Sequence, residues 1–212
     1  MAATDGGGDT LTALDGATRA LVRSAAALAG GSEDAVRAEL QRAAVDASHS
    51  WVEEVLLQTY LFAGFPRALN GMRAWRRIAG PGSPQREPQP RETTHAAGER
   101  VCAAVYGSMY DRLRLNVREL HPLLDDWMIS EGYGKVLSRP QLDLPRRELC
   151  IMAACAATGQ DRQLQSHLHG ARNVGVGESI IGDALQALSG LVPAELLGRA
   201  TRLWDRIRND VH

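Results

Sequence analysis

The sequence has few of the residues on which several classes of protein depend. Lys135 is its only lysine, so a Schiff-base mechanism would have to use that residue. The three cysteines, Cys102, Cys150 and Cys155, are too few and too irregularly spaced for a disulfide framework, and no pair has C-x-x-C spacing. The formal net charge of −1 at pH 7 argues against a nucleic-acid-binding protein that depends on a basic surface.

Long apolar runs are also missing. The longest, residues 149–157, has about half of the ~20 residues that a membrane span needs. Residues 1–10 have neither the basic start nor the apolar centre of a signal peptide, and they predict a flexible tail.

A metal site is also not expected. His167 and His169 diverge by about 200° on a helix and cannot share a metal. We therefore expect a cytoplasmic protein without cofactor or metal, and without a membrane or nucleic-acid partner.

Helical periodicity dominates the chain, whereas the alternation typical of strands is nearly absent. Ser32 has the position of a helix N-cap, and residues 50–53 have capping-box spacing. Gly64 predicts a helix end and Pro66 the first turn of the next helix. The signals together predict an all-α protein with helices over residues 15–30, from 32 onward, 50–61, 66–78, 98–118, 122–130, 144–158, 161–174, 178–190 and 193–209.

The first and last parts of the chain are similar to each other in sequence. A shift of 128 residues places Arg19 on Arg147 and Gly31 on Gly159, and apolar positions recur in the same order over about 55 residues. The alternative is that two amphipathic helix pairs look alike by chance. We predict two tandem repeats of a four-helix unit, residues 11–78 and 141–212. Between them lie a Pro-rich linker over 79–97, which is a surface excursion or partly disordered, and a helical insert with an Arg-Pro turn over 98–140.

Three polar residues of the second repeat stand out. His167 falls inside an apolar helical stripe, Gln163 lies one turn before it, and Glu148 opens the preceding helix. The equivalent positions of the first repeat carry other residues. Polar side chains turned toward an interior are costly unless they are paired or line a cavity. Two interpretations remain open: a buried His–Glu hydrogen bond that locks two helices, or a catalytic site.

Recognisable motifs surround these residues. They are Tyr133–Pro140, Arg147-Glu148, Gln163–His167 and Ala171–Gly175 in the second half, and residues 52–58 and 60–70 in the first. With these motifs the chain resembles the carboxymuconolactone decarboxylase family, which is related to the alkyl hydroperoxidase D-like proteins. The resemblance implies an alkyl hydroperoxidase D-like helical fold and a homo-oligomer, expected to be a trimer.

The resemblance further implies a lyase of the decarboxylase type that acts on a small anionic lactone or cyclic acid. Decarboxylation requires a place for the electron pair that carbon dioxide leaves behind, and a proton to quench it. His167 would stabilise the dienolate and supply the proton. Glu148 would orient that imidazole, and Gln163 would donate a hydrogen bond to the substrate.

The substrate-binding residues are expected to come from the insert with the Arg-Pro turn and from the first repeat. Arg139 could clamp a substrate carboxylate, and a loop-anchoring role fits it equally well. Tyr133 belongs to the same motif, whereas Phe65 and Asn70 belong to the 60–70 segment of the first repeat. We therefore predict one composite site per chain, built where the two repeats pack together.

Two other functions remain as alternatives. An alkyl hydroperoxidase-like oxidoreductase would need a C-x-x-C, but Gln160 and Gln163 hold those positions. Cys150 and Cys155 are offset by roughly 7.5 Å along a helix and could bridge only if the helix unwound. The second alternative is a binding or assembly module of the same fold without catalysis.

Overall fold

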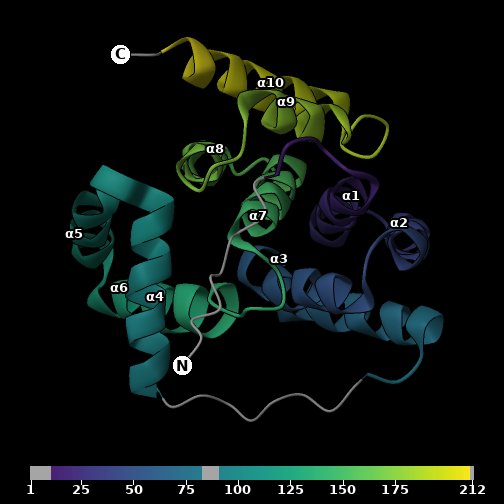
Figure 1. The fold of residues 1–212 in the computed structure, drawn as a ribbon, viewed down its shortest axis with the longest axis horizontal. Coiled ribbons are helices and arrows are strands. Elements are labelled where there is room, and N and C mark those ends of the chain that lie inside the picture. The colour runs from purple at the N-terminus through teal and green to yellow at the C-terminus, as the bar shows by residue number, and fades with distance from the viewer. Residues whose placement is uncertain (1–10, 83–90, 211–212) are drawn as a thin grey trace, which may run out of the picture.

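The computed structural model describes residues 11–82 and 91–210, and every regular element within these ranges is helical (Figure 1). This architecture confirms the predicted all-α class. The expected flexible tail over 1–10 and the central residues of the Pro-rich linker, 83–90, lie outside the described residues.

Helical segments follow one another along the described parts of the chain. They are α1 (Gly16–Gly30), α2 (Glu33–Asp46), α3 (His49–Ala79), α4 (Arg91–Tyr106), the 3₁₀ turn η1 (Gly107–Met109), α5 (Tyr110–Leu120), α6 (Pro122–Trp127), the π-helical segment η2 (Met128–Leu137), α7 (Leu144–Thr158), α8 (Asp161–Asn173), α9 (Glu178–Gln186) and α10 (Ala194–Asn209).

Side-chain caps set most of the predicted helix starts. The carboxylate of Asp15 accepts a hydrogen bond from the backbone of Thr18, and the Ser32 hydroxyl does the same for the second helix. For α3 the predicted capping box at Ser50 is wrong. Ser48 has the extended backbone of an N-cap, and its hydroxyl accepts from the backbone N–H of Trp51 at 3.4 Å.

The long helix α3 is two helical stretches joined at Gly64, as the sequence predicted. Gly64 has φ 80° and ψ 163°, and Pro66 follows in the first turn of the second stretch. This backbone conformation is essentially restricted to glycine, because a Cβ would clash with the neighbouring backbone. The break changes the direction of the chain just after the segment that approaches the second half of the protein.

Gly64→Ala is expected to lower the free energy of unfolding by about 1–3 kcal/mol, because alanine is strained at this φ and ψ. Urea denaturation of the variant and the wild type would measure the loss. Gly16→Ala is the matched control, since Gly16 begins α1 at negative φ and a Cβ there meets no atom within 4 Å. Equal stability of the two variants would contradict the prediction.

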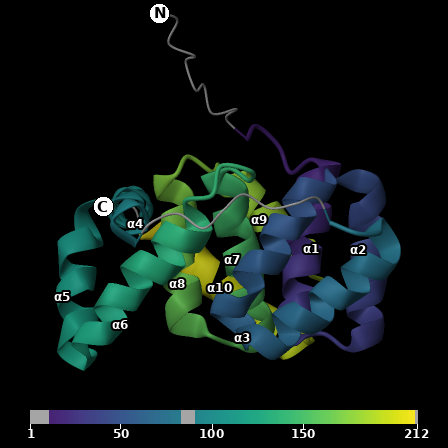
Figure 2. The same cartoon turned by 90° about the horizontal axis from the view of Figure 1, so that it is seen from below.

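Helix α7 is the centre of the fold. It packs against α1, α3 and α8, and residues 147–157 are all buried. Figure 2 shows α1, α2 and α3 on one side of it and α4, α5 and α6 on the other. Side chains at the start of α7 can therefore meet residues from both halves of the chain.

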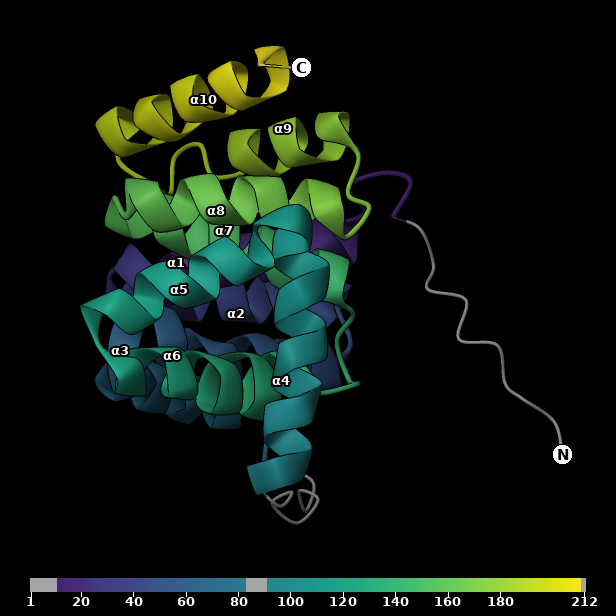
Figure 3. The same ribbon diagram turned by 90° about the vertical axis from the view of Figure 1, so that its left-hand side faces the viewer.

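Helix α4 and the π-helical segment cross at very short range. A Cβ at Gly98 would run into the backbone of Ile129, and a Cβ at Gly134 would run into the backbone of Thr94. Glycine at both positions therefore allows the two backbones to touch. Figure 3 shows α4 running across the layer that contains α6.

Three features of this region differ from the sequence-based helices. Helix α4 begins at Arg91, inside the predicted linker, and the predicted helix 98–118 is interrupted at Gly107, where φ is 54°. The predicted loop through residues 132–134 is part of the π-helical segment. Its stability comes from contacts with α4, which are distant in sequence and invisible to local periodicity.

The helix boundaries follow the offset seen in the sequence. Gly16 and Leu144 begin α1 and α7, 128 residues apart, and Glu33 and Asp161 begin α2 and α8 with the same offset. The boundaries agree with the predicted pair of four-helix units. That the two units are a tandem repeat stays a prediction.

Candidate active site

The predicted acid and histidine are in direct contact in the interior. Glu148 lies in the first turns of α7 and His167 lies on α8, with 2.8 Å between Glu148 Oε2 and His167 Nδ1. Glu148 has no exposed surface, and His167 is 5% exposed. Because Nδ1 faces the carboxylate, Nε2 is the imidazole nitrogen left for a substrate.

The Glu148 carboxylate is held tightly against the backbone of α8. A Cβ at Gly170 would lie 2.6 Å from Glu148 Oε2 and 2.7 Å from a methyl carbon of Val105. The other carboxylate oxygen, Glu148 Oε1, is buried and has no hydrogen-bond partner within the described residues. Buried polar atoms are nearly always hydrogen-bonded, so this acceptor is unusual and marks a place where a ligand or water would be bound.

Phe62 brings the first half of the chain to this pair. Its ring meets the imidazole of His167 edge to face, with centroids 5.8 Å apart and planes at 85°. Phe62 lies in the 60–70 segment, on the stretch of α3 before the break at Gly64. The contact agrees with a composite site, although the aromatic residue that supplies it is not the predicted Phe65.

Two tyrosines lie on the side of the π-helical segment. The rings of Tyr106 and Tyr133 meet edge to face, with centroids 6.2 Å apart and planes at 75°. Burial raises the pKa of Tyr106 to about 12 and that of Tyr133 well above its usual value, and the charge of Glu148 raises both further. Both phenols are therefore neutral hydrogen-bonding groups at physiological pH.

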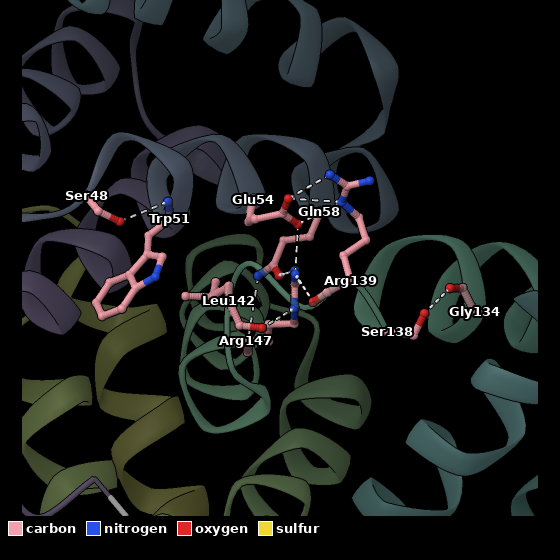
Figure 4. A network of polar contacts seen from close by, with 9 residues as sticks. All are labelled: Ser48, Trp51, Glu54, Gln58, Gly134, Ser138, Arg139, Leu142 and Arg147. Carbon is pink, nitrogen blue, oxygen red and sulfur yellow. Dashed lines mark hydrogen bonds and ion pairs between the residues drawn. The ribbon is translucent and has the colours of Figure 1, made fainter. Parts of the chain in front are cut away.

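The predicted substrate clamp Arg139 forms an ion pair within the protein. Its guanidinium lies 2.9–3.0 Å from both carboxylate oxygens of the buried Glu54. Arg147 binds the same carboxylate at 2.8 Å, together with the side chain of Gln58 and the carbonyl oxygens of Arg139 and Leu142 (Figure 4). This Glu54 network ties α3 to the turn before α7, so Arg139 has the loop-anchoring role rather than that of a free clamp.

Three other predicted site residues lie at the surface. Gln163 is exposed, so the expectation that it turns inward with His167 is wrong. Phe65 is 63% exposed and stacks on Tyr60 with centroids 4.8 Å apart. Asn70 is exposed, accepts a hydrogen bond from Arg73, and lines a cavity on another face of the molecule.

Sequence reasoning missed several residues of the site. Phe62 and Glu54 were inside the segments that carry the resemblance, but helical spacing alone did not single them out. Gly170 had a usable signal, because a glycine one turn after a buried histidine allows close approach of another group. Tyr106 had no signal, since its contact with Tyr133 depends on the crossing of α4 and the π-helical segment.

The cysteines are buried, and the described residues hold no cluster of metal ligands. All three cysteines are buried free thiols, and burial raises the pKa of each to about 12. Over residues 11–82 and 91–210, no three His, Cys, Asp or Glu side chains gather as metal ligands. In the same part of the chain, no helix combines the length and apolarity that crossing a membrane requires.

The site thus combines a buried carboxylate–histidine pair, a carboxylate oxygen without a hydrogen-bond partner in the described residues, and two neutral phenols, all within an all-α fold. Groups of these kinds can exchange protons with a ligand. Residues 124–196, which contain Glu148, His167 and Tyr133, match the model of the carboxymuconolactone decarboxylase family. This match supports the family resemblance predicted from the sequence, over about a third of the chain.

One curated relative comes from Saccharomyces cerevisiae. The chain is 26% identical to Peroxisomal protein 2 of that yeast in an alignment 168 residues long, and the match covers 66% of this chain. The aligned region spans 59% of the length of the yeast protein.

Proposed function

We propose that the protein is a decarboxylase-type lyase in which His167 and Glu148 perform acid–base catalysis on a small anionic lactone or cyclic acid. The observation that carries the proposal is the 2.8 Å contact between Glu148 Oε2 and His167 Nδ1 in a buried environment. The contact fixes the orientation of the imidazole ring, and it leaves Nε2 to exchange a proton with a substrate.

The pair supplies what the reaction needs. The bond between the ring carbon and the substrate carboxylate breaks, carbon dioxide leaves, and the electron pair spreads onto the lactone carbonyl. Imidazolium Nε2–H of His167 would first donate a hydrogen bond to the dienolate oxygen and then protonate the carbanionic carbon. Glu148 keeps the imidazole ring in place throughout, and a proton from water replaces the one that His167 gives to the substrate carbon.

The surroundings of the pair favour a small and largely apolar substrate body. Phe62 lies against the imidazole ring, and it is itself only half-buried. Substrate entry would therefore take place on the Phe62 side. Tyr106 and Tyr133 are neutral donors next to Glu148, and would bind substrate oxygens without adding charge.

The oxidoreductase alternative depends on a reactive thiolate, and the environment of the cysteines argues against it. A thiol whose pKa is about 12 is almost entirely protonated at neutral pH, and the thiolate is the nucleophile in disulfide and peroxide chemistry. Turnover by Cys150→Ala and by Cys155→Ala is expected to stay within about threefold of wild type. Loss of turnover in a variant with a wild-type melting temperature would favour the thiol mechanism.

The assay for the proposed activity follows carboxymuconolactone by ultraviolet absorbance and measures the carbon dioxide released. Equal amounts of lactone consumed and carbon dioxide formed are expected. Release of carbon dioxide distinguishes the lyase from a hydrolase, which would open the ring and keep the carboxylate. Absence of turnover with carboxymuconolactone and related cyclic acids would overturn the proposal and favour a binding or assembly module.

The proposed site uses both halves of the chain, and we infer that these are two tandem repeats. The common offset of 128 residues between α1 and α7, and between α2 and α8, supports this origin. On this view, one repeat has kept the acid–histidine pair while the other supplies Phe62. We expect the chain to form a homo-oligomer, as the family resemblance implies.

A further inference from the structure

A large cleft lies away from His167, between α2 and the second stretch of α3. Its volume is about 660 Å³, which is within the range of pockets for small organic ligands. Its apolar part is formed by Leu28, Val36, Ala74 and Ile78, which come from α1, α2 and α3. Figure 2 shows these three helices grouped on one side of the molecule.

The polar part of the cleft is strongly basic. Four arginines line it, Arg37, Arg67, Arg73 and Arg77, whereas Glu33 is the one carboxylate among the lining residues. Like charges so close together repel one another, and the repulsion is relieved when an anion binds among them. The cleft therefore combines an apolar surface with an excess of positive charge.

The contacts of these arginines leave most of that charge unneutralised. Arg67 donates to the carbonyl oxygens of Ala27, Leu28 and Gly31 at the end of α1. Arg73 donates to the neutral amide oxygen of Asn70 at 3.1 Å. Within the described residues, neither Arg73 nor Arg77 forms an ion pair, and both are exposed. Of the four arginines, only Arg37 has a carboxylate partner in the part of the chain that the structure describes: the exposed Asp34, at 3.2 Å.

A second cleft provides an internal comparison. It has about 430 Å³ and lies between α8 and α10, the helices that follow α2 and the second stretch of α3 by the 128-residue offset. There the carboxylate of Asp161 pairs with Arg199 at 2.5 Å, which joins the two helices across the cleft. Gly71 occupies the position equivalent to Arg199 in the first cleft, so no side chain can make this bridge. The first cleft is thus the larger and the less neutralised of the two.

We propose that the cleft between α2 and α3 binds a small organic carboxylate with an apolar body. The guanidinium groups of Arg73 and Arg77 hold the carboxylate, because a planar guanidinium donates two parallel hydrogen bonds to it. Leu28, Val36, Ala74 and Ile78 receive the apolar body. This binding site is separate from the Glu148–His167 pair and does not depend on the proposed reaction.

Isothermal titration calorimetry with 4-phenylbutyrate tests the proposal, with acetate and the neutral 4-phenylbutyramide as comparison probes. The wild type is expected to bind phenylbutyrate, and to bind acetate and the amide at least about tenfold more weakly, because each lacks one of the two recognised features. Arg73→Gln/Arg77→Gln should weaken phenylbutyrate binding about 10- to 100-fold. Arg112→Gln, which changes an exposed arginine on α5, is the matched control and should bind like wild type.

Binding by His167→Ala separates this cleft from the acid–histidine pair. Unchanged affinity for phenylbutyrate in that variant supports the cleft as the binding site. Equal affinity of wild type and the double arginine variant would overturn the proposal, as would equal affinity for the acid and the amide. Absence of measurable binding at about 1 mM phenylbutyrate would also overturn it.

Discussion

Replacing His167 by alanine should reduce the turnover of carboxymuconolactone by a factor of roughly 10² to 10⁴, the usual contribution of a positioned general acid. The variant loses both the proton donor and the charge that stabilises the dienolate. The change should appear in kcat, because the imidazolium acts on the electron density that develops in the transition state and contributes little to ground-state binding. Ultraviolet initial rates over a range of substrate concentrations would separate kcat from KM.

Two further variants distinguish a loss of catalysis from a loss of folding. His167→Gln retains a hydrogen-bonding partner for the Glu148 carboxylate and guards against a loss of activity that is due to unfolding. His169→Ala is the matched control, since His169 lies two residues away on α8 and is exposed. Turnover of His167→Gln within about threefold of wild type would show that the pair only locks α7 to α8.

The largest effect on stability is expected for Glu54→Gln, about 3–5 kcal/mol in the free energy of unfolding. The substitution removes the carboxylate that neutralises Arg147, whose side chain has no exposed surface and binds Glu54 at 2.8 Å. A buried charge without its partner keeps the whole cost of its lost hydration. Guanidinium chloride denaturation followed by circular dichroism would measure the difference.

Asp34→Asn is the control for removing a carboxylate from an ion pair. Asp34 pairs with Arg37 at 3.2 Å on the surface, where such a pair contributes about 0–1 kcal/mol. The double variant Glu54→Leu/Arg147→Met should be more stable than Glu54→Gln alone, because it removes both buried charges together. A loss below about 1 kcal/mol for Glu54→Gln would mean that the carbonyl oxygens of Arg139 and Leu142 suffice to hold Arg147.

Local signals in the sequence were sufficient for most of the fold. Caps such as Asp15 and Ser32, and the break at Gly64, act within a few residues, so the chain on either side determines them. The Glu148–His167 contact was also predictable, because an apolar stripe on α8 can face only the interior. These features depend on spacing within one helix or between two consecutive helices.

The remaining errors concern contacts between distant parts of the chain. Periodicity places Gln163 on the same side of α8 as His167, but it does not indicate how far the neighbouring helices cover that side. Gln163 is therefore exposed although His167 is buried. The ion pair of Arg139 joins it to Glu54, 85 residues earlier, and no local pattern indicates it. The π-helical segment likewise depends on α4, which reaches it only because Gly98 and Gly134 permit contact of the two backbones.

The close fit of Glu148 against Gly170 has a consequence for how substrate preference can change. The carboxylate is confined by the backbone of α8 and by Val105, so its position follows the distance between α7 and α8 rather than a side-chain rotamer. The acid is therefore preorganised and cannot shift to suit a larger ring. Phe62, which also contacts the imidazole, is only half-buried and is not confined in this way. New substrates would accordingly be acquired by changes around Phe62, while the proton-transfer pair stays the same.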